Sequence, residues 1–213
     1  MRAGRTICET AHVVSLALWI GAVGMSAVTA AIVFPTMREL DPVLPGYGGY
    51  EGEHWALAAG KVAFQVFFAA DVVQLGAGAM ALLTFLLATL AFGLPTARVS
   101  TFVRACFLIG AIGVVSYHLF VLAPRMNSEL RAYWLAAAAG ETATAEAHRA
   151  AFSGEHPRAR FVLSATGLLA LGALAAGVWS IARCDGGAEA PGGVGRAAAA
   201  SELEEPALAR RRA

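Results

Sequence analysis

The sequence is poor in charge and contains no recognisable catalytic or metal-binding motif. Charged residues make up 15% of the 213 residues, against about a quarter in an ordinary soluble domain. The net charge is +1, and no basic run is long enough to follow a phosphate backbone, so we expect no nucleic-acid partner. The three cysteines, Cys8, Cys106 and Cys184, form no CxxC pair or similar metal spacing.

Catalytic signatures are missing as well. The chain has no GxSxG and no HExxH motif. The glycine-rich stretch at residues 46–49 is predicted to be a flexible turn rather than a phosphate-binding loop, because no strand precedes it. We therefore predict that the protein is not an enzyme, with no catalytic residue, no metal ligand and no cofactor.

Long apolar runs dominate what is present. The chain is 58% hydrophobic, and the excess is concentrated at about residues 13–34, 70–93, 102–123 and 159–182. A helix of about 20 apolar residues crosses the hydrocarbon layer of about 30 Å. A soluble bundle would need charged stripes along each helix, yet the third and fourth runs are free of charge from Cys106 to Leu122 and from Phe161 to Ala182. The predicted fold is an all-α bundle of four transmembrane helices.

The predicted organisation has three parts. Residues 1–11 form a short basic lead, residues 12–182 the four-span domain, and residues 183–213 a disordered tail rich in Gly, Ala, Glu and Arg. The first apolar run is too long for an ordinary signal core, so we expect it to stay uncleaved. Pro35 is expected to end the first helix, and Pro124 the third.

Two connections carry further predictions. The second helix is expected to start near Glu53, so that its first part lies at or above the membrane surface. In the long connection between the third and fourth spans, Leu130, Tyr133, Trp134 and Ala137 recur at helical spacing. That spacing predicts an interfacial helix closed by Gly140. Thr142 is expected to cap a second short helix, and His156-Pro157 to begin the fourth span.

Glycines recur in every span. Small residues let membrane helices approach closely, so we interpret these glycines as packing positions rather than as a transport path. They are Gly21 and Gly24, Gly76 and Gly78, Gly110 and Gly113, and Gly172 and Gly177.

Polar residues at membrane depth are the default candidates for function. They are His12, Asp71, Gln74 and His118. His12 and His118 should differ in height by about 24 Å at the helical rise, which excludes them as the two axial ligands of one haem. His12 is expected near a helix end or the membrane interface.

Asp71, His118, Arg125 and His156 are predicted to form one polar cluster near the opposite face. Two interpretations stay open: a proton- or ion-handling site, or a salt-bridge network that fixes helix register. A metal site from His118, His148 and His156 has no tight ligand spacing in its favour.

The orientation follows from an even number of spans and from charge. The second-to-third loop region holds Arg98 and Arg104 without an acid, whereas the first loop is acidic. The positive-inside rule therefore favours cytoplasmic termini, although the long third connection also carries several arginines. All three cysteines fall near that same face, as a reducing compartment would allow.

The chain resembles the transmembrane protein 205-like family of four-span proteins, which has bacterial members. The resemblance rests on His12, Trp19 and Gly21 in the first span, on residues 122–127 at the exit of the third, and on Phe152 and His156 before the fourth. It covers about residues 12–182. Ala159 and Leu163 stand where the family tends to have Ser and Asn.

The resemblance implies a multi-pass protein of a bacterial cytoplasmic membrane without an assigned reaction. We expect a non-enzymatic accessory or transport-related component whose partners are the lipid bilayer and either a second copy or another membrane protein. Copper-resistance-type membrane domains share a similar first-span His and Trp-x-Gly pattern. They give the alternative prediction, a haem- or copper-handling membrane subunit that uses His118 and His156.

Overall fold

The computed structural model describes residues 2–94 and 98–185. The chain divides into two compact units, residues 1–178 and 179–213, and the fold and sites below belong to the first. Of the tail predicted for residues 183–213, residues 186–213 lie outside the described part, and residues 183–185 belong to the last helix.

Helices make up nearly all of the described chain. In order they are α1 (Arg2–Leu40), η1 (Pro45–Tyr47), α2 (His54–Leu90), α3 (Val99–Tyr117), η2 (His118–Leu122), α4 (Ala123–Ala138), α5 (Thr142–Gly154) and α6 (His156–Asp185). Residues 2–94 and 98–185 contain no strand. The sequence-based prediction of an all-α fold is confirmed.

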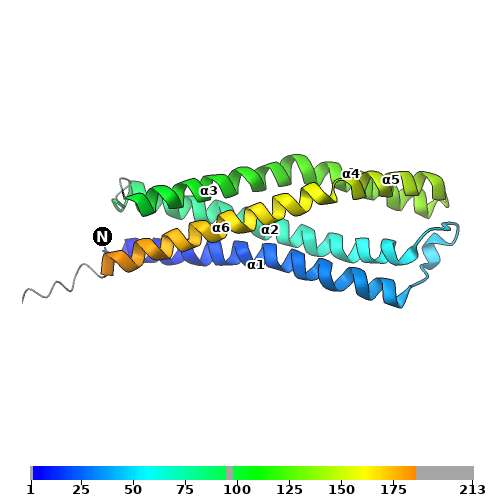
Figure 1. The fold of residues 1–213 in the computed structure, drawn as a ribbon, viewed down its shortest axis with the longest axis horizontal. Coiled ribbons are helices and arrows are strands. Elements are labelled where there is room, and N and C mark those ends of the chain that lie inside the picture. The colour runs from blue at the N-terminus through cyan, green and yellow to red at the C-terminus, as the bar shows by residue number, and fades with distance from the viewer. Residues whose placement is uncertain (1, 95–97, 186–213) are drawn as a thin grey trace, which may run out of the picture. The chain divides into compact units, whose positions relative to one another are not determined.

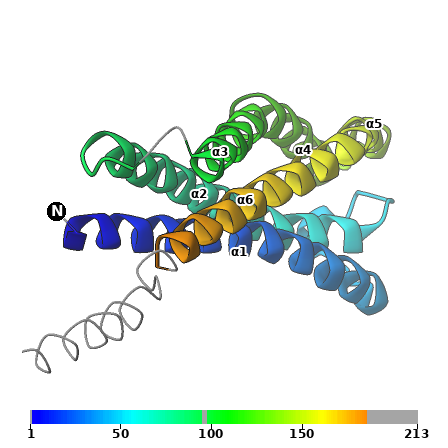
Figure 2. The ribbon, with the colours of Figure 1, turned by 60° about the vertical axis from the view of Figure 1, so that its left-hand side comes forward.

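These helices join into four long rods. The rods Ala3–Leu40, His54–Leu90, Val99–Ala138 and Thr142–Ser180 are each long and apolar enough to cross a bilayer. The protein is therefore a multi-pass integral membrane protein. Figures 1 and 2 show α1 beside α2 along most of their length, with the α3–α4 rod and α6 completing the bundle.

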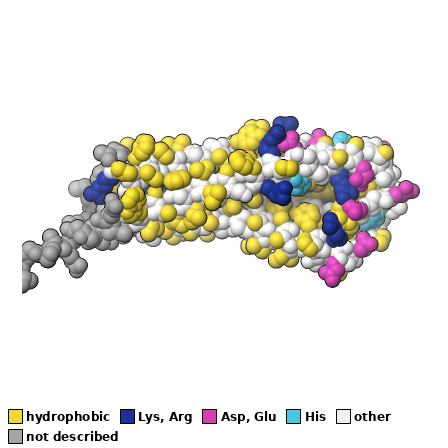
Figure 3. Space-filling model, in the orientation of Figure 1, with side chains coloured by type: hydrophobic (Ala, Val, Ile, Leu, Met, Phe, Trp, Pro, Cys, Tyr) yellow, Lys and Arg dark blue, Asp and Glu magenta, His cyan; other side chains and the backbone are white. Residues whose placement is uncertain are grey.

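Each rod is longer than the membrane requires. At 37–40 residues the rods measure about 55–60 Å, against a hydrocarbon layer of about 30 Å. The charged side chains collect at one end of the face seen in Figure 3, whereas the other end is mainly hydrophobic. We call the charged end, which holds residues 41–53 and 139–141, the distal end.

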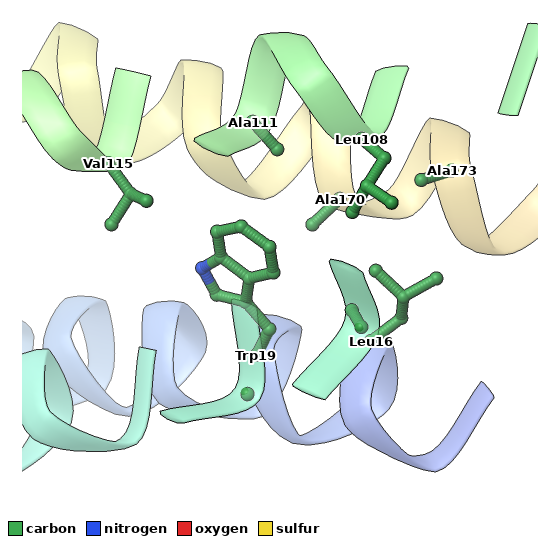
Figure 4. Packing of buried hydrophobic residues seen from close by; sticks show 9 residues of the cluster. Leu16, Trp19, Leu108, Ala111, Val115, Ala170 and Ala173 are labelled. Carbon is green, nitrogen blue, oxygen red and sulfur yellow. The ribbon is translucent and has the colours of Figure 1, made fainter. Parts of the chain in front are cut away.

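The apolar half packs around Trp19. Trp19 and Leu16 of α1, Leu108 of α3 and Ala170 of α6 are all fully buried in one cluster, and Figure 4 shows the indole ring between the helices. A Cβ on Gly78 of α2 would lie 3.0 Å from Trp19 Cη2. Gly78 therefore gives the indole room to lie against α2.

A second core fills the distal end. Tyr50 of the first loop and Leu57 of α2 pack with Leu130, Tyr133 and Ala137 of α4. The helix predicted from the apolar spacing of residues 130–137 is thus confirmed, and its apolar face is buried in the protein. That face packs against α2 and the first loop, so this part of the third connection extends the bundle beyond the spans.

Several predicted boundaries differ from the observed ones. Residues 2–11, expected as a lead, already belong to α1. Pro35 does not end α1, which continues to Leu40, because one proline removes a single backbone hydrogen bond that a long packed helix can lose. Thr142 is the first residue of α5 rather than its cap, and its hydroxyl accepts a hydrogen bond from Glu51 N at 3.1 Å.

The glycines fall into two groups. An added Cβ on Gly78, Gly110, Gly172 or Gly177 would meet a neighbouring side chain, so these four are packing positions as predicted. An added Cβ on Gly21, Gly24, Gly76 or Gly113 would meet nothing within 4 Å. The packing interpretation is wrong for the second group within this chain, because those glycines face away from the bundle.

Candidate functional site

A cavity of about 770 Å³ lies where the apolar half of the bundle meets the distal end. Its walls come from α1, α2, α4, α5 and α6 together with His118 of η2. Aromatic and aliphatic side chains supply most of the surface, among them Phe34, Phe64, Phe68 and Phe152. The volume is in the range of small-molecule sites, about 300–1,000 Å³.

The polar side chains of the cavity include three of the four predicted cluster residues. Asp71, His118 and His156 line it together with Arg149 and Arg160. Figure 3 shows a hollow in this region with basic side chains at its border and hydrophobic ones inside. The predicted convergence of Asp71, His118 and His156 on one place is therefore observed.

Asp71 holds His118 in a defined orientation. Asp71 Oδ1 lies 3.1 Å from His118 Nε2 and accepts a second hydrogen bond from Gln74 Nε2 at 3.2 Å. An ionised carboxylate only accepts hydrogen bonds, so Nε2 carries the imidazole proton. His118 Nδ1 is buried without a partner among the described residues.

Arg125 does not join these residues. Its side chain is 63% exposed and lies 3.7 Å from Glu155, outside the cavity wall. The reason is the π-helical turn η2, in which the N–H of Ala123 bonds to the carbonyl of His118, five residues back. A π-turn holds more residues than an α-turn, so it rotates Arg125 away from the side of His118. The turn lies next to Pro124, which has no N–H to donate.

Two of the remaining histidines have contacts of their own. His148 Nδ1 lies 2.8 Å from Glu129, and the His156 ring packs edge-on against Phe152. No group of three or more His, Cys, Asp or Glu side chains in the described ranges is arranged to hold a metal ion.

A second buried polar cluster lies in the apolar half, and the sequence did not predict it. Arg104 of α3 and His12 of α1 are both fully buried, and Glu9 is 8% exposed. Arg104 Nη1 donates to Glu9 Oε2 at 2.8 Å, and Arg104 Nε donates to His12 Nε2 at 3.0 Å. The expectation that His12 lies at a helix end or interface is wrong.

The contacts of His12 settle its tautomer. Because Nε2 accepts from Arg104, the imidazole hydrogen must be on Nδ1. Nδ1 lies 2.9 Å from the carbonyl of Ala81 and 3.2 Å from Thr84 Oγ1, both on α2. One imidazole therefore joins three helices, α1, α2 and α3.

A sequence signal for this cluster existed. Glu9 and His12 are three residues apart, so they share a helix face, and Arg104 lies within an apolar run at the corresponding depth of a parallel helix. An arginine in that position needs a partner. Because Arg104 is buried in the bundle rather than placed in the loop, only Arg98 of that pair remains for the positive-inside argument.

A third network fastens the first loop to the distal helices. The Tyr50 hydroxyl donates to Glu146 of α5 and lies 3.2 Å from the Tyr133 hydroxyl. Arg149 binds both Glu53 and Glu146. Burial, and then the hydrogen bonds to Glu146 and Tyr133, raise the pKa of Tyr50 well above its ordinary value.

Comparisons with known proteins add no relative. No protein-family model, no curated protein and no solved structure matches the chain. The described residues are therefore assigned to a four-helix membrane protein on the evidence of their own apolar helices alone.

Proposed function

We propose that the protein is a non-enzymatic membrane component that holds a small molecule with a long apolar body in the cavity. The main evidence for this proposal is the apolar cavity of about 770 Å³, which has the Asp71–His118 pair on its wall. Such sites combine mostly apolar walls with a few placed polar groups. A role in binding or transport fits the position of the cavity where the spans meet the distal end.

His118 is not arranged as the base of a serine relay. In a nucleophilic relay, a carboxylate orients the histidine while its other nitrogen takes a proton from the nucleophile. Here His118 Nδ1 has no hydrogen-bond partner among the described residues. No serine hydroxyl of the cavity wall is therefore within reach of it.

Quenching of tryptophan fluorescence by a brominated long-chain alcohol tests the proposal, because Trp55 lines the cavity. The protein in a neutral detergent should show saturable quenching. Ala30→Phe fills part of the cavity and should weaken it about tenfold or more. Ala17→Phe is the matched control on the same helix, since Ala17 is exposed and does not line the cavity. Equal quenching in both variants would refute the proposal.

The alternative, a haem- or copper-handling subunit, has one observation in its favour. Histidines that bind metals commonly donate their second N–H to a carboxylate, as His118 does to Asp71, and His156 lines the same cavity. An absorption spectrum and metal analysis of purified protein distinguish the two functions. A Soret band or stoichiometric copper that disappears in His118→Ala would favour the alternative.

For location we propose a bacterial cytoplasmic membrane with both termini in the cytoplasm, in line with the family resemblance. Arg98 and the cysteine positions support this orientation. A fluorescent protein fused to the C-terminus should fluoresce, and alkaline phosphatase at the same place should stay inactive; the reverse pattern would invert the orientation. A second copy or another membrane protein remains the proposed partner, to be checked by the mass of the purified complex.

A further inference from the structure

We infer that the occupant of the cavity is a single-chain amphiphile with an anionic head group, recognised by Arg160. This inference rests on the proposed function, because it names the class of molecule that the same cavity takes. The evidence for it is the pairing of the charged side chains on the cavity wall.

The other charged groups on the wall are already matched. Arg149 binds Glu53 and Glu146, and Asp71 binds His118 and Gln74. Glu155, the acid nearest in sequence to Arg160, is engaged by Arg125 and Arg158.

Arg160 differs from these groups. It has no ion pair or hydrogen bond within the described ranges. The described residues therefore leave this positive charge on the cavity wall without an acidic partner.

Arg160 also lies on the correct face of its helix. His156, Ala159, Arg160, Leu163 and Ser164 all line the cavity, and their spacing places them along one side of α6. The same side thus offers a guanidinium near the start of the helix and apolar surface beyond it. An arginine fork suits the two oxygens of a carboxylate or phosphate.

The size of the cavity favours one chain. Its volume of about 770 Å³ matches a site for a single drug-sized molecule. Fatty acids and lysophospholipids share the required chemistry, whereas a two-chain bilayer lipid has twice the apolar bulk.

The experiment compares two brominated probes with the same chain, a carboxylic acid and an alcohol, by tryptophan quenching at about pH 8, where the acid is ionised. The wild type should bind the acid about tenfold more tightly than the alcohol, as a charge-assisted contact implies. Arg160→Gln should weaken acid binding until the acid and the alcohol bind about equally. Arg158→Gln is the control: it removes the same charge two residues away, from a side chain that does not line the cavity.

The other outcomes are distinct. Equal binding of acid and alcohol by the wild type, or equal loss of acid binding in both arginine variants, would overturn the inference and leave the proposed function standing. Failure of both probes would refute the proposed function itself. Displacement of the acid by inorganic phosphate alone would show that no chain is needed. Displacement by phosphatidylglycerol as effective as by the unbrominated acid would identify a bilayer lipid as the occupant. Each of these two results contradicts the single-chain ligand.

Discussion

Arg104 Nη1 lies 2.8 Å from Glu9 Oε2, and the arginine side chain has no exposure to solvent. Arg104 Nε also donates to His12, and Arg104 Cζ lies 5.5 Å from the centre of the Phe85 ring. An added Cβ on Gly177 would lie 3.6 Å from Arg104 Nε, so a glycine of α6 lies against the guanidinium. This ion pair links α1 to α3 in the apolar half of the bundle.

Removing only the arginine should therefore be costly. Arg104→Met leaves Glu9 buried without its partner, and we expect the free energy of unfolding to fall by about 3–5 kcal/mol. The double variant Glu9→Leu/Arg104→Met should recover most of that loss, because no buried charge remains. Arg158→Met, at an exposed pair, should cost no more than about 1 kcal/mol. Denaturant titrations in mixed micelles measure all three, and equal losses in Arg104→Met and Arg158→Met would contradict the buried pair.

The structure predicts which ring nitrogen of His12 is protonated, and NMR spectroscopy can test this. The hydrogen bond from Arg104 Nε occupies His12 Nε2, so the ring hydrogen should be on Nδ1 at neutral pH. Nitrogen-15 NMR of histidine-labelled protein, with His12→Gln to assign the signal, shows which nitrogen is protonated. A signal for Nε2–H would mean that Arg104 does not donate to this ring.

The space around Trp19 predicts a difference between two neighbouring glycines. Gly78→Ala places a Cβ 3.0 Å from the fully buried indole. We expect a loss of about 1–3 kcal/mol, typical of an overpacked core. Gly76→Ala meets nothing within 4 Å and should be neutral or stabilising by up to about 1 kcal/mol, through helix propensity. Unfolding titrations of the pair check this, and equal stability would argue against the contact between Gly78 and Trp19.

The distal network predicts a loss of stability at alkaline pH. Unfolded tyrosine ionises near about pH 10, whereas burial raises the pKa of folded Tyr50 above that value. The folded state thus keeps a proton that the unfolded state loses, so the stabilisation is complete below about pH 10 and declines above it. The stability of the wild type relative to Tyr50→Phe should therefore be constant at lower pH and fall above about pH 10. A difference that stays constant across this range would contradict the burial of Tyr50.

Substitution of Asp71 separates a structural role from a functional one. Asp71→Asn keeps an oxygen that can accept from His118 and Gln74, so stability should change by less than about 1 kcal/mol, whereas Asp71→Leu should lose about 1–3 kcal/mol. If the network only fixes helix register, Asp71→Asn will bind the brominated probes as the wild type does. Altered probe binding at unchanged stability would instead place Asp71 in the ligand site.

The sequence alone determined the class of the protein and most of its helices. Four apolar runs of this length are compatible only with helices that lie in the hydrocarbon layer of a membrane. The spacing of residues 130–137 identified the apolar face of α4. The convergence of Asp71, His118 and His156 could also be predicted, because helix direction and rise fix the height of each residue along a bundle.

Rotation about each helix axis and close packing were decided only by the tertiary structure. The π-turn at residues 118–122 places Arg125 away from His118. The pattern of apolar residues does not predict such a turn. Pairing of Arg104 with Glu9 and His12 depends on which faces of α1 and α3 meet. The height of a residue in the bundle follows from its position along its own helix, because the rise per residue is constant. The direction in which its side chain points depends on how the other helices pack around that helix.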